Sequence, residues 1–353
     1  MSIDSHKKRV YDCLAYKGYD RIPIKHCGTN EIDAELFKYF GVNDNDGMLE
    51  KIGDDFRGVS PIYKGPELKK YPDGSWEGEW GERYKNVDFG KGVYPEAFFL
   101  PFKDVTDVSE LNKFRFPSAD WFDYSTIKDQ CNKYAGYAVT FGSPGFLDFM
   151  NGIARCRGVE KVLYDIADED PVFLELMEKR FRYHYEKCEK VLKAAGGLID
   201  IVHIGEDLGS QNGPIINPEI FDKLFKPRFK PFFDMVHKYN VKVMMHSCGS
   251  VRKMIPRLID MGLDILDVVQ VDAANMDIKE LHKEFYHNIC FCGSISVQST
   301  LPFGKKEDVI KEVLLRLELF KDGGLILGPT HAIQAGTPIE NILAMYRAAG
   351  SLK

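Results

Sequence analysis

KVMMHSCGS, residues 242–250, is an apolar run that ends in polar residues and a glycine, the pattern of a buried strand that leads into a loop. Long amphipathic stretches flank such runs, and two of them, residues 171–196 and 305–324, end on glycine pairs as helices commonly do. Strands that alternate with helices pair in parallel through right-handed crossovers. Five further runs of the same kind predict strands at YAVTFGS (137–143), DIVHIGED (200–207), ILDVVQ (265–270), ICFCGS (289–294) and LILGPTH (325–331).

Two earlier runs, RIPIKHC (21–27) and DFRGVSP (55–61), raise the expected number of strands to eight. Eight βα units predict an α/β fold, the closed TIM (β/α)8 barrel, whose working site lies at the C-terminal ends of the strands. An open doubly wound sheet is the alternative, but no strand is followed by the G-x-G-x-x-G turn of dinucleotide-binding folds. We therefore predict one barrel domain over residues 1–353 with an N-terminal extension.

Residues 62–120 interrupt this alternation with an aromatic-rich insertion. The turn signals PDG (72–74) and GKG (90–92) predict β-hairpins there rather than barrel strands. One reading is an appendage that packs its aromatic side chains on the barrel wall. The other is a lid over the barrel mouth, in which Trp76 and Trp80 bind an apolar or aromatic substrate.

The composition excludes several classes of protein. The 353 residues carry a formal net charge of −6, so no overall basic field attracts nucleic acid. No segment approaches the roughly 20 apolar residues that cross a membrane. The eight cysteines are scattered, and no signal peptide precedes them, so we expect reduced thiols and a cytoplasmic protein. The oligomeric state stays open, with a homodimer as one possibility.

His246 and Cys248 are the first candidates for chemistry. Residues two apart on a strand share a face, and the alternation of a barrel would turn both inward at its catalytic end. An imidazole nitrogen and a thiolate suit zinc better than magnesium or calcium. The alternative is a buried core pair with no ligand.

Other strand ends supply further donors to the same mouth. A catalytic zinc takes three protein ligands and keeps one position open. We prefer His331 as the third ligand, ahead of Cys292, with Glu206 as an occasional fourth. Glu206 or Asp207 could orient the substrate or protonate a leaving oxygen, although Asp207 could equally cap a turn.

The remaining candidates are assigned by their position along the strands. His26 ends the first predicted strand and could reach the mouth as a substrate-binding residue. His203 is out of phase with Glu206 and is expected to pack outward under a helix, and Cys290 is expected to face helix packing. Ser-His-Asp catalysis has no support, because the chain contains no G-x-S-x-G elbow.

Several segments together resemble the uroporphyrinogen decarboxylase superfamily. They are KKRVYDCLAYKGYDRIPI, DGSWEGEWG, HIGEDLGSQNGPIINPEIFDKLFKPRFK, VMMHSCGSV, LDVVQ, CGSISVQSTLPFG and GLILGPTHAIQAGTPIENI. The resemblance is closest to the methyltransferase branch, which includes methylcobamide:coenzyme M and methyl-donor:corrinoid methyltransferases. It implies a TIM barrel, and its His-x-Cys zinc pattern falls on His246 and Cys248. The third ligand of that branch is usually Cys, where this chain has His331.

The resemblance also implies an activity. It predicts a zinc-dependent methyltransferase that moves a methyl group between a small methylated substrate and the cobalt of a corrinoid (cobalamin) held by a partner protein. The aromatic insertion slightly favours a methoxylated aromatic donor, hence O-demethylation in anaerobic one-carbon metabolism. Porphyrinogen decarboxylases carry an Arg-Gln-Ala-Gly-Arg loop after the first strand, where this chain reads KHCGTNE (25–31) without arginine. A decarboxylase acting on a non-porphyrin acid and a non-catalytic ligand-binding barrel remain the alternatives.

Overall fold

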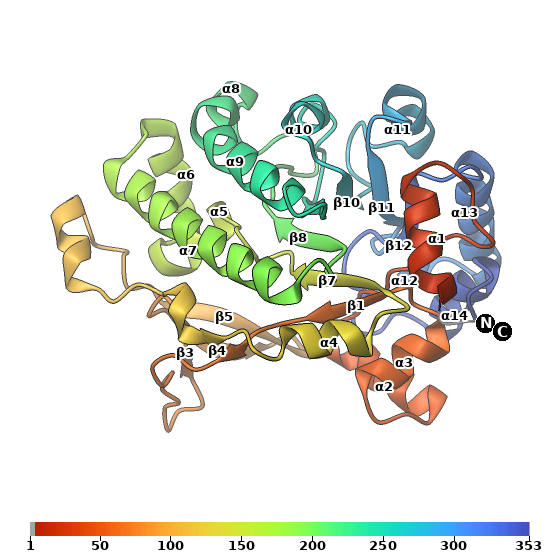
Figure 1. The fold of residues 1–353 in the computed structure, drawn as a ribbon, viewed down its shortest axis with the longest axis horizontal. Coiled ribbons are helices and arrows are strands. Elements are labelled where there is room, and N and C mark those ends of the chain that lie inside the picture. Colours follow the sequence, from red (N-terminus) through yellow and green to blue (C-terminus); the bar gives the residue numbers. More distant parts are fainter. Residues whose placement is uncertain (1–3, 353) are drawn as a thin grey trace.

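In the computed structural model, which describes residues 4–352, parallel strands curl around a common axis with helices on the outside (Figure 1). Each strand pairs in parallel with the next one in the order β1-β7-β8-β9-β10-β11-β12. The predicted α/β barrel-type fold is therefore confirmed. The strands are β1 (Phe56–Val59), β7 (Ala138–Gly142), β8 (Ile201–Gly205), β9 (Lys242–His246), β10 (Ile265–Val269), β11 (Cys290–Ile295) and β12 (Leu325–Pro329).

Residues 22–28 occupy the eighth position, between β12 and β1. Ile24 forms a parallel bridge with Leu327, and its carbonyl accepts the backbone N–H of Asp55 at 3.0 Å. The segment is not a regular strand, because carboxylates take the N–H groups that a ladder would use. Asp55 Oδ2 accepts from Ile24 N–H at 2.7 Å, and Asp54 Oδ2 accepts from His26 N–H at 2.6 Å. The segment predicted as a strand at 21–27 thus lies at the expected position in the barrel, but it is extended chain with isolated bridges rather than a regular strand.

Helices cover the outer face of the sheet. The longest, α7, begins at Pro171 after the capping carboxylate of Asp170 and ends where Gly196 takes a left-handed φ of 60°. The helices are α1 (Asp4–Leu14), α2 (Asn30–Phe40), α3 (Asn45–Ile52), α4 (Ile127–Lys133), α5 (Met150–Arg157), α6 (Val159–Asp168), α7 (Pro171–Ala195), α8 (Pro218–Ile220), α9 (Lys226–His237), α10 (Ile255–Met261), α11 (Ile278–Phe285), α12 (Thr300–Phe303), α13 (Lys306–Leu319) and α14 (Ile339–Ala348).

Helix α1 packs on the N-terminal end of the barrel interior. Val10 belongs to the apolar cluster formed by inward side chains near the strand starts, such as Ile201 and Met244. Cys290 belongs to this cluster too, with its thiol directed at the carbonyl of Leu14, the last residue of α1, so it faces a helix as expected. With this end filled, the C-terminal ends of the strands are left for a site.

The insertion folds as predicted into antiparallel β structure. The strands β3 (Trp76–Glu77), β4 (Arg83–Asp88) and β5 (Val93–Phe99) form one sheet, and β2 (Ile62–Tyr63) pairs with β6 (Phe122–Asp123). The β4–β5 turn contains Gly90, whose φ of 87° favours glycine. Figure 1 shows this sheet beside the barrel, below α7. Within residues 4–352 no helix combines the length and apolarity needed to cross a bilayer.

Candidate metal centre and its cavities

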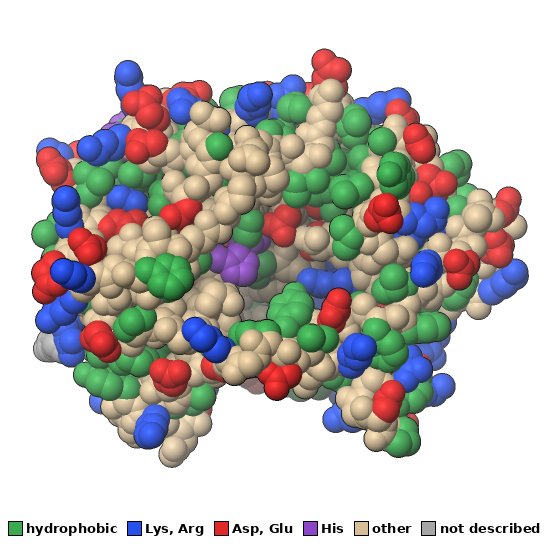
Figure 2. Space-filling view, turned by 180° about the vertical axis from the view of Figure 1, so that it is seen from behind, with side chains coloured by type: hydrophobic (Ala, Val, Ile, Leu, Met, Phe, Trp, Pro, Cys, Tyr) green, Lys and Arg blue, Asp and Glu red, His purple; other side chains and the backbone are tan. Residues whose placement is uncertain are grey.

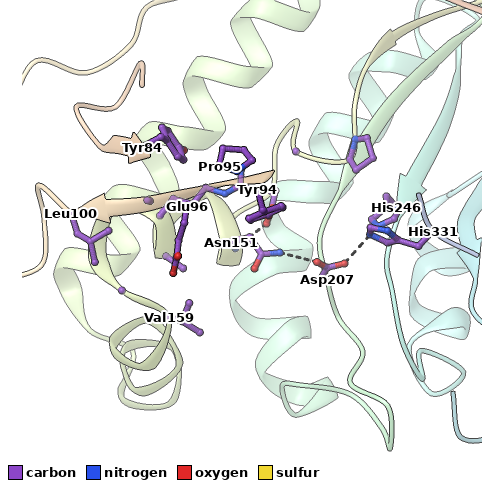
Figure 3. A pocket seen from close by; sticks show the side chains of 17 residues that line it. Tyr84, Tyr94, Pro95, Glu96, Leu100, Asn151, Val159, Asp207, His246 and His331 are labelled. Atoms are coloured by element: carbon purple, nitrogen blue, oxygen red, sulfur yellow. Dashed lines mark hydrogen bonds and ion pairs between the residues drawn. The ribbon is translucent and has the colours of Figure 1, made fainter. Parts of the chain in front are cut away.

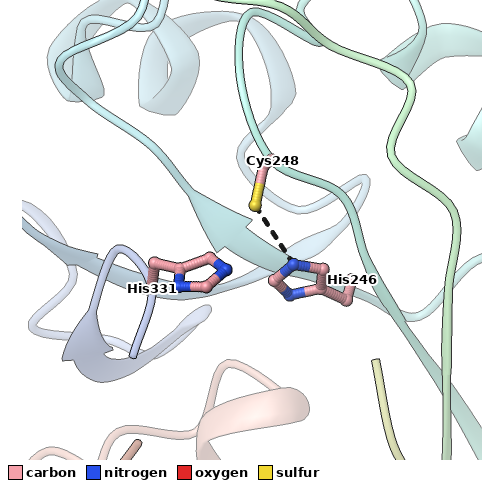
Figure 4. A group of neighbouring side chains, drawn as sticks. All are labelled: His246, Cys248 and His331. Atoms are coloured by element: carbon pink, nitrogen blue, oxygen red, sulfur yellow. Dashed lines mark hydrogen bonds between the residues drawn. The ribbon is translucent and has the colours of Figure 1, made fainter. Parts of the chain in front are cut away.

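Three side chains meet at the C-terminal ends of β9 and β12. One ligand atom from each of His246, Cys248 and His331 lies within 4.8 Å of the others, and His246 Nε2 is 3.1 Å from Cys248 Sγ (Figure 4). Donor atoms around a tetrahedral zinc are about 3.3–3.8 Å apart, given bonds of about 2.0–2.3 Å. Small rotations would therefore suffice, and His331 is an exposed loop residue that can make them. The donor set of two imidazoles and one thiol fits zinc.

The loop after β9 is held by close contact with the loop after β8. Gly249 has a φ of 81°, and a Cβ built there would lie 2.5 Å from the carbonyl carbon and oxygen of Gly209. The backbone N–H of Cys248 donates to Asp207 Oδ1 at 3.1 Å. These contacts require glycine at position 249, because a side chain there would meet backbone atoms that cannot move aside. They fix the direction of the Cys248 side chain.

Asp267, on the neighbouring strand β10, determines which ring nitrogen of His246 carries the proton. Its Oδ2 lies 3.1 Å from His246 Nδ1 and 3.1 Å from His203 Nε2, and Lys25 Nζ is 3.7 Å from its Oδ1. Burial alone would raise the pKa of Asp267, but Lys25 and the two histidines hold it well below its usual value. A carboxylate only accepts hydrogen bonds, so Nδ1 of His246 carries the proton and Nε2 is left to bind a metal.

The same contacts act on the pKa of His246. Burial lowers it, but the hydrogen bonds with Asp267 and Cys248 outweigh burial and raise it well above the usual value.

The structure reverses the directions predicted for His203, on β8, and for Glu206, the residue just after that strand. His203 points into the barrel toward Asp267 rather than outward under a helix. Glu206 points away from the cavity and is 1% exposed, and its carboxylate accepts the backbone N–H groups of Phe149 and Met150 at 2.8 and 3.0 Å. Burial raises its pKa well above the usual value. Glu206 therefore anchors the start of α5, and neither a catalytic nor a ligand role fits its position.

An outer cavity of about 560 Å³ opens beside the three donors. Figure 2 shows a hollow on this face of the molecule, with histidine inside it and both acidic and basic side chains around it. In Figure 3, His246 and His331 lie at one end and residues of β5 at the other. The side chains that line it include Tyr84, Tyr94, Glu96, Asp148, Asn151, Arg155, Asp207, His246 and His331.

Asp207 is held in this cavity by its neighbours. Asn151 Nδ2 donates to Asp207 Oδ2 at 2.8 Å. The other carboxylate oxygen, Asp207 Oδ1, lies 3.8 Å from His246 Nε2. Asp148 is buried nearby, and burial raises its pKa to about 6, with the charge of Asp207 adding to the shift.

A smaller inner chamber of about 230 Å³ lies on the other side of the two histidines. His246 and His331 line both spaces, so the candidate metal centre separates them. Lys25, Cys27 and Cys292 line the chamber. Cys292 is not in the group of three converging donors, and burial raises its pKa well above the usual value.

The three residues predicted to bind substrate lie outside the outer cavity. Trp76 stacks on Tyr84, a cavity residue, with ring centroids 5.9 Å apart. Trp80 packs on Tyr183 of α7 and is 9% exposed. The ring nitrogens of His26 hydrogen-bond to the Tyr346 hydroxyl at 2.6 Å and to Asp33 at 3.0 Å, so both are occupied within the protein.

Asp267 and Lys25 were missed at the sequence level. Each interrupts an apolar strand pattern, ILDVVQ and RIPIKHC respectively, and that interruption was the available signal. A charged residue inside a buried strand needs a partner, which here is the other member of the pair.

Comparison with known proteins identifies the family. The model of the family described as Uroporphyrinogen decarboxylase (URO-D) matches residues 147–352, more than half of the chain. The chain belongs to the URO-D family. The predicted superfamily is therefore confirmed.

Two relatives show how far this URO-D chain has diverged. Uroporphyrinogen decarboxylase 2, chloroplastic, from Oryza sativa subsp. japonica is 22% identical over 274 residues, which cover 75% of this chain and 66% of that protein, just under two thirds. A solved structure titled methyltransferase from Methanosarcina mazei has a TM-score of 0.65 at 17% identity and covers 98% of each chain. At that identity the likeness shows a shared fold.

Proposed function

We propose that this URO-D family member is a zinc-dependent methyltransferase that moves a methyl group between a small methylated substrate and the cobalt of a corrinoid protein. The observation that carries the proposal is the convergence of His246, Cys248 and His331 at the border of a cavity. The fold shared with the Methanosarcina mazei methyltransferase and the sequence resemblance to corrinoid-dependent enzymes support it. A methoxylated aromatic is the donor we favour, and we place the protein in the cytoplasm.

His246, Cys248 and His331 would hold the zinc, which would act as a Lewis acid on the heteroatom that bears the methyl group. Asp207 lies next to His246 and is oriented by Asn151, so it can position the substrate. Burial raises the pKa of Asp148 to about 6, closer to neutral pH than an ordinary carboxyl, so it can exchange a proton with the leaving group. Tyr84 and Tyr94 line the same cavity and offer aromatic surface to a substrate.

Zinc analysis tests the ligand set. Wild type should contain about one zinc per chain, Cys248→Ala should lose it, and Cys131→Ala, a buried cysteine on α4, should keep it. In a chelator competition, His331→Ala should weaken zinc binding far more than Cys292→Ser. Undiminished zinc in Cys248→Ala would refute the site, and the reverse ranking of the other two variants would move the third ligand to Cys292.

Methyl transfer tests the activity. The zinc-loaded protein should convert cob(I)alamin to methylcobalamin, followed by absorbance, with one of a panel of methoxylated aromatics, methylated amines or methylthiols. Should neither this reaction nor its reverse from methylcobalamin to thiols occur with zinc bound, the methyltransferase proposal fails. The decarboxylase alternative would then be tested next.

A further inference from the structure

We propose that Arg155 binds a carboxylate of the substrate at the far end of the outer cavity, so that the methyl donor is an aromatic anion whose methylated end faces the metal centre. This inference rests on the proposed function for the identity of the reacting end. The anion site itself is argued from the cavity alone.

Arg155 lies on the same helix face as a residue that reaches the metal centre. Asn151 and Arg155 are four residues apart on α5 and therefore neighbours on one face, about 6 Å apart along the axis. Asn151 donates to Asp207, which adjoins His246. Arg155 therefore lies about one helical turn beyond Asn151, along the wall of the same cavity.

Arg155 is exposed and lines the cavity. Among residues 6–352, whose side chains the structure describes, it takes part in no ion pair and no side-chain hydrogen bond. The neighbouring arginines are occupied: Arg157 pairs with Asp165 at 2.5 Å, and Arg180 donates to the Asp148 carbonyl at 2.5 Å. Arg155 is thus the cation on this wall whose five N–H donors are all available.

An aromatic recess adjoins the guanidinium. Trp76, Tyr84, Tyr94, Pro95 and Arg155 line a space of about 300 Å³, and all of them except Trp76 also line the outer cavity. Rings of this kind bind a flat apolar body, while the guanidinium fork matches a carboxylate with two parallel hydrogen bonds. An aromatic carboxylate presents both features in one molecule.

None of the three carboxylates that line the cavity forms an ion pair with Arg155 among the described residues, so the guanidinium is free to bind an anion. Asp207 accepts from Asn151 and from the Cys248 N–H, and Asp148 accepts from the Asn151 N–H at 3.0 Å. Glu96, on β5, is the remaining carboxylate of the lining, and it is exposed and lies beyond ion-pair distance of Arg155. Its charge opposes an anion, so removing it should strengthen carboxylate binding.

Calorimetric titration of the zinc-loaded protein tests the inference, with 4-methoxybenzoate compared with 4-methoxybenzyl alcohol. We expect the benzoate to bind more tightly. Arg155→Gln should weaken benzoate binding by roughly 10- to 100-fold, the effect of losing hydrogen bonds to a charged group, and change alcohol binding less than about twofold. Glu96→Gln should tighten benzoate binding, and Arg182→Gln, on the exposed face of α7, should leave both unchanged.

Equal loss of both ligands in Arg155→Gln, or tighter binding of the alcohol by wild type, would overturn the anion site. Binding is measured without methyl transfer, so the two proposals fail separately. Benzoate binding that depends on Arg155 without any methylation of cobalamin would retain the anion site and reject the methyltransferase. Methyl transfer to cobalamin with 4-methoxybenzoate binding unchanged in Arg155→Gln would retain the methyltransferase and reject the anion site.

Discussion

The ionised side chain of Asp267 is buried at the centre of a charged group that includes one candidate ligand. It is 2% exposed and faces His203, His246 and Lys25. A histidine that binds a metal commonly donates its second N–H to such a carboxylate, which fixes the ring and makes the ligand more basic. The geometry at His246 has this form, with Nδ1 toward Asp267 and Nε2 toward Cys248.

Asp267→Asn should therefore weaken zinc binding by about 10- to 100-fold, because the amide lacks the charge and can present a donor to His246. Chelator competition measures the affinity, and a cobalt(II)-substituted protein should show an altered visible spectrum. Asp272→Asn, whose carboxylate bonds Ser296 and Ser299 instead, is the matched control. If the protein does not fold because the buried charge of Lys25 has lost its partner, the double variant with Lys25→Met removes that charge. Unchanged zinc affinity in a folded variant would refute the positioning role.

The sequence located the three converging donors because each stands at or just after a strand end. It did not locate their support. His203 was assigned to the wrong face because the phase was counted from Glu206, which lies beyond the last residue of β8, Gly205. Strand alternation holds only within the strand, so a residue in the following loop cannot fix the direction of those before it.

At the scale of the element, the aromatic composition of the insertion did not reveal which of its side chains would pack on the barrel and which would line the cavity. The aromatic insertion is expected either to pack on the barrel or to bind substrate, and its aromatic side chains lie in two different settings. Trp80 packs edge-on against Tyr183 and Phe116, with the Arg180 guanidinium 5.5 Å from its ring. Tyr84 and Tyr94 line the cavity instead. Contacts between positions 80 and 183 are set by the fold and leave no local pattern in the chain.

Trp80→Ala should lower the free energy of unfolding by about 3–5 kcal/mol, the usual cost of truncating a large buried aromatic. Denaturant titration measures this loss, and Trp80→Phe should recover part of it. Trp76→Ala should instead raise the KM of an aromatic donor, because Tyr84 loses the ring that it stacks on. A Trp80→Ala protein of normal stability with a raised KM would contradict this division of roles.

At the scale of the whole molecule, the barrel was predictable because seven of its strands are apolar runs bounded by polar residues. The eighth was harder to predict, since residues 22–28 hydrogen-bond to the carboxylates of Asp54 and Asp55 as well as to β12. Asp55 also pairs with Arg9 of α1 and with Arg21, so one carboxylate ties the terminal helix to the point where the sheet closes. Such a junction depends on residues distant in sequence, which no periodicity encodes.

His184 makes the stability of the whole fold depend on pH. It lies on α7, is 6% exposed and packs edge-on against Phe146, and neither ring nitrogen has a hydrogen-bond partner among the described residues. Burial, with the charges of Arg180 and Lys187 adding to it, lowers the pKa of His184 well below the usual value. The folded protein therefore keeps the ring neutral at pH values where the unfolded chain takes up a proton.

The sign of the effect follows from proton uptake. Above a pH of about 6.5 both states hold the ring neutral, and the free energy of unfolding does not depend on His184. Below it the unfolded state binds the extra proton, so stability falls by up to about 1.4 kcal/mol per pH unit until the folded pKa is reached. His184→Leu should remove this contribution without losing a hydrogen bond. Urea unfolding of both proteins between pH 7.5 and 5, values chosen around the histidine pKa, should give a stability difference that shifts in favour of the variant as the pH falls. A difference that stays constant over this range would mean that His184 is protonated in the folded protein as readily as in the unfolded chain.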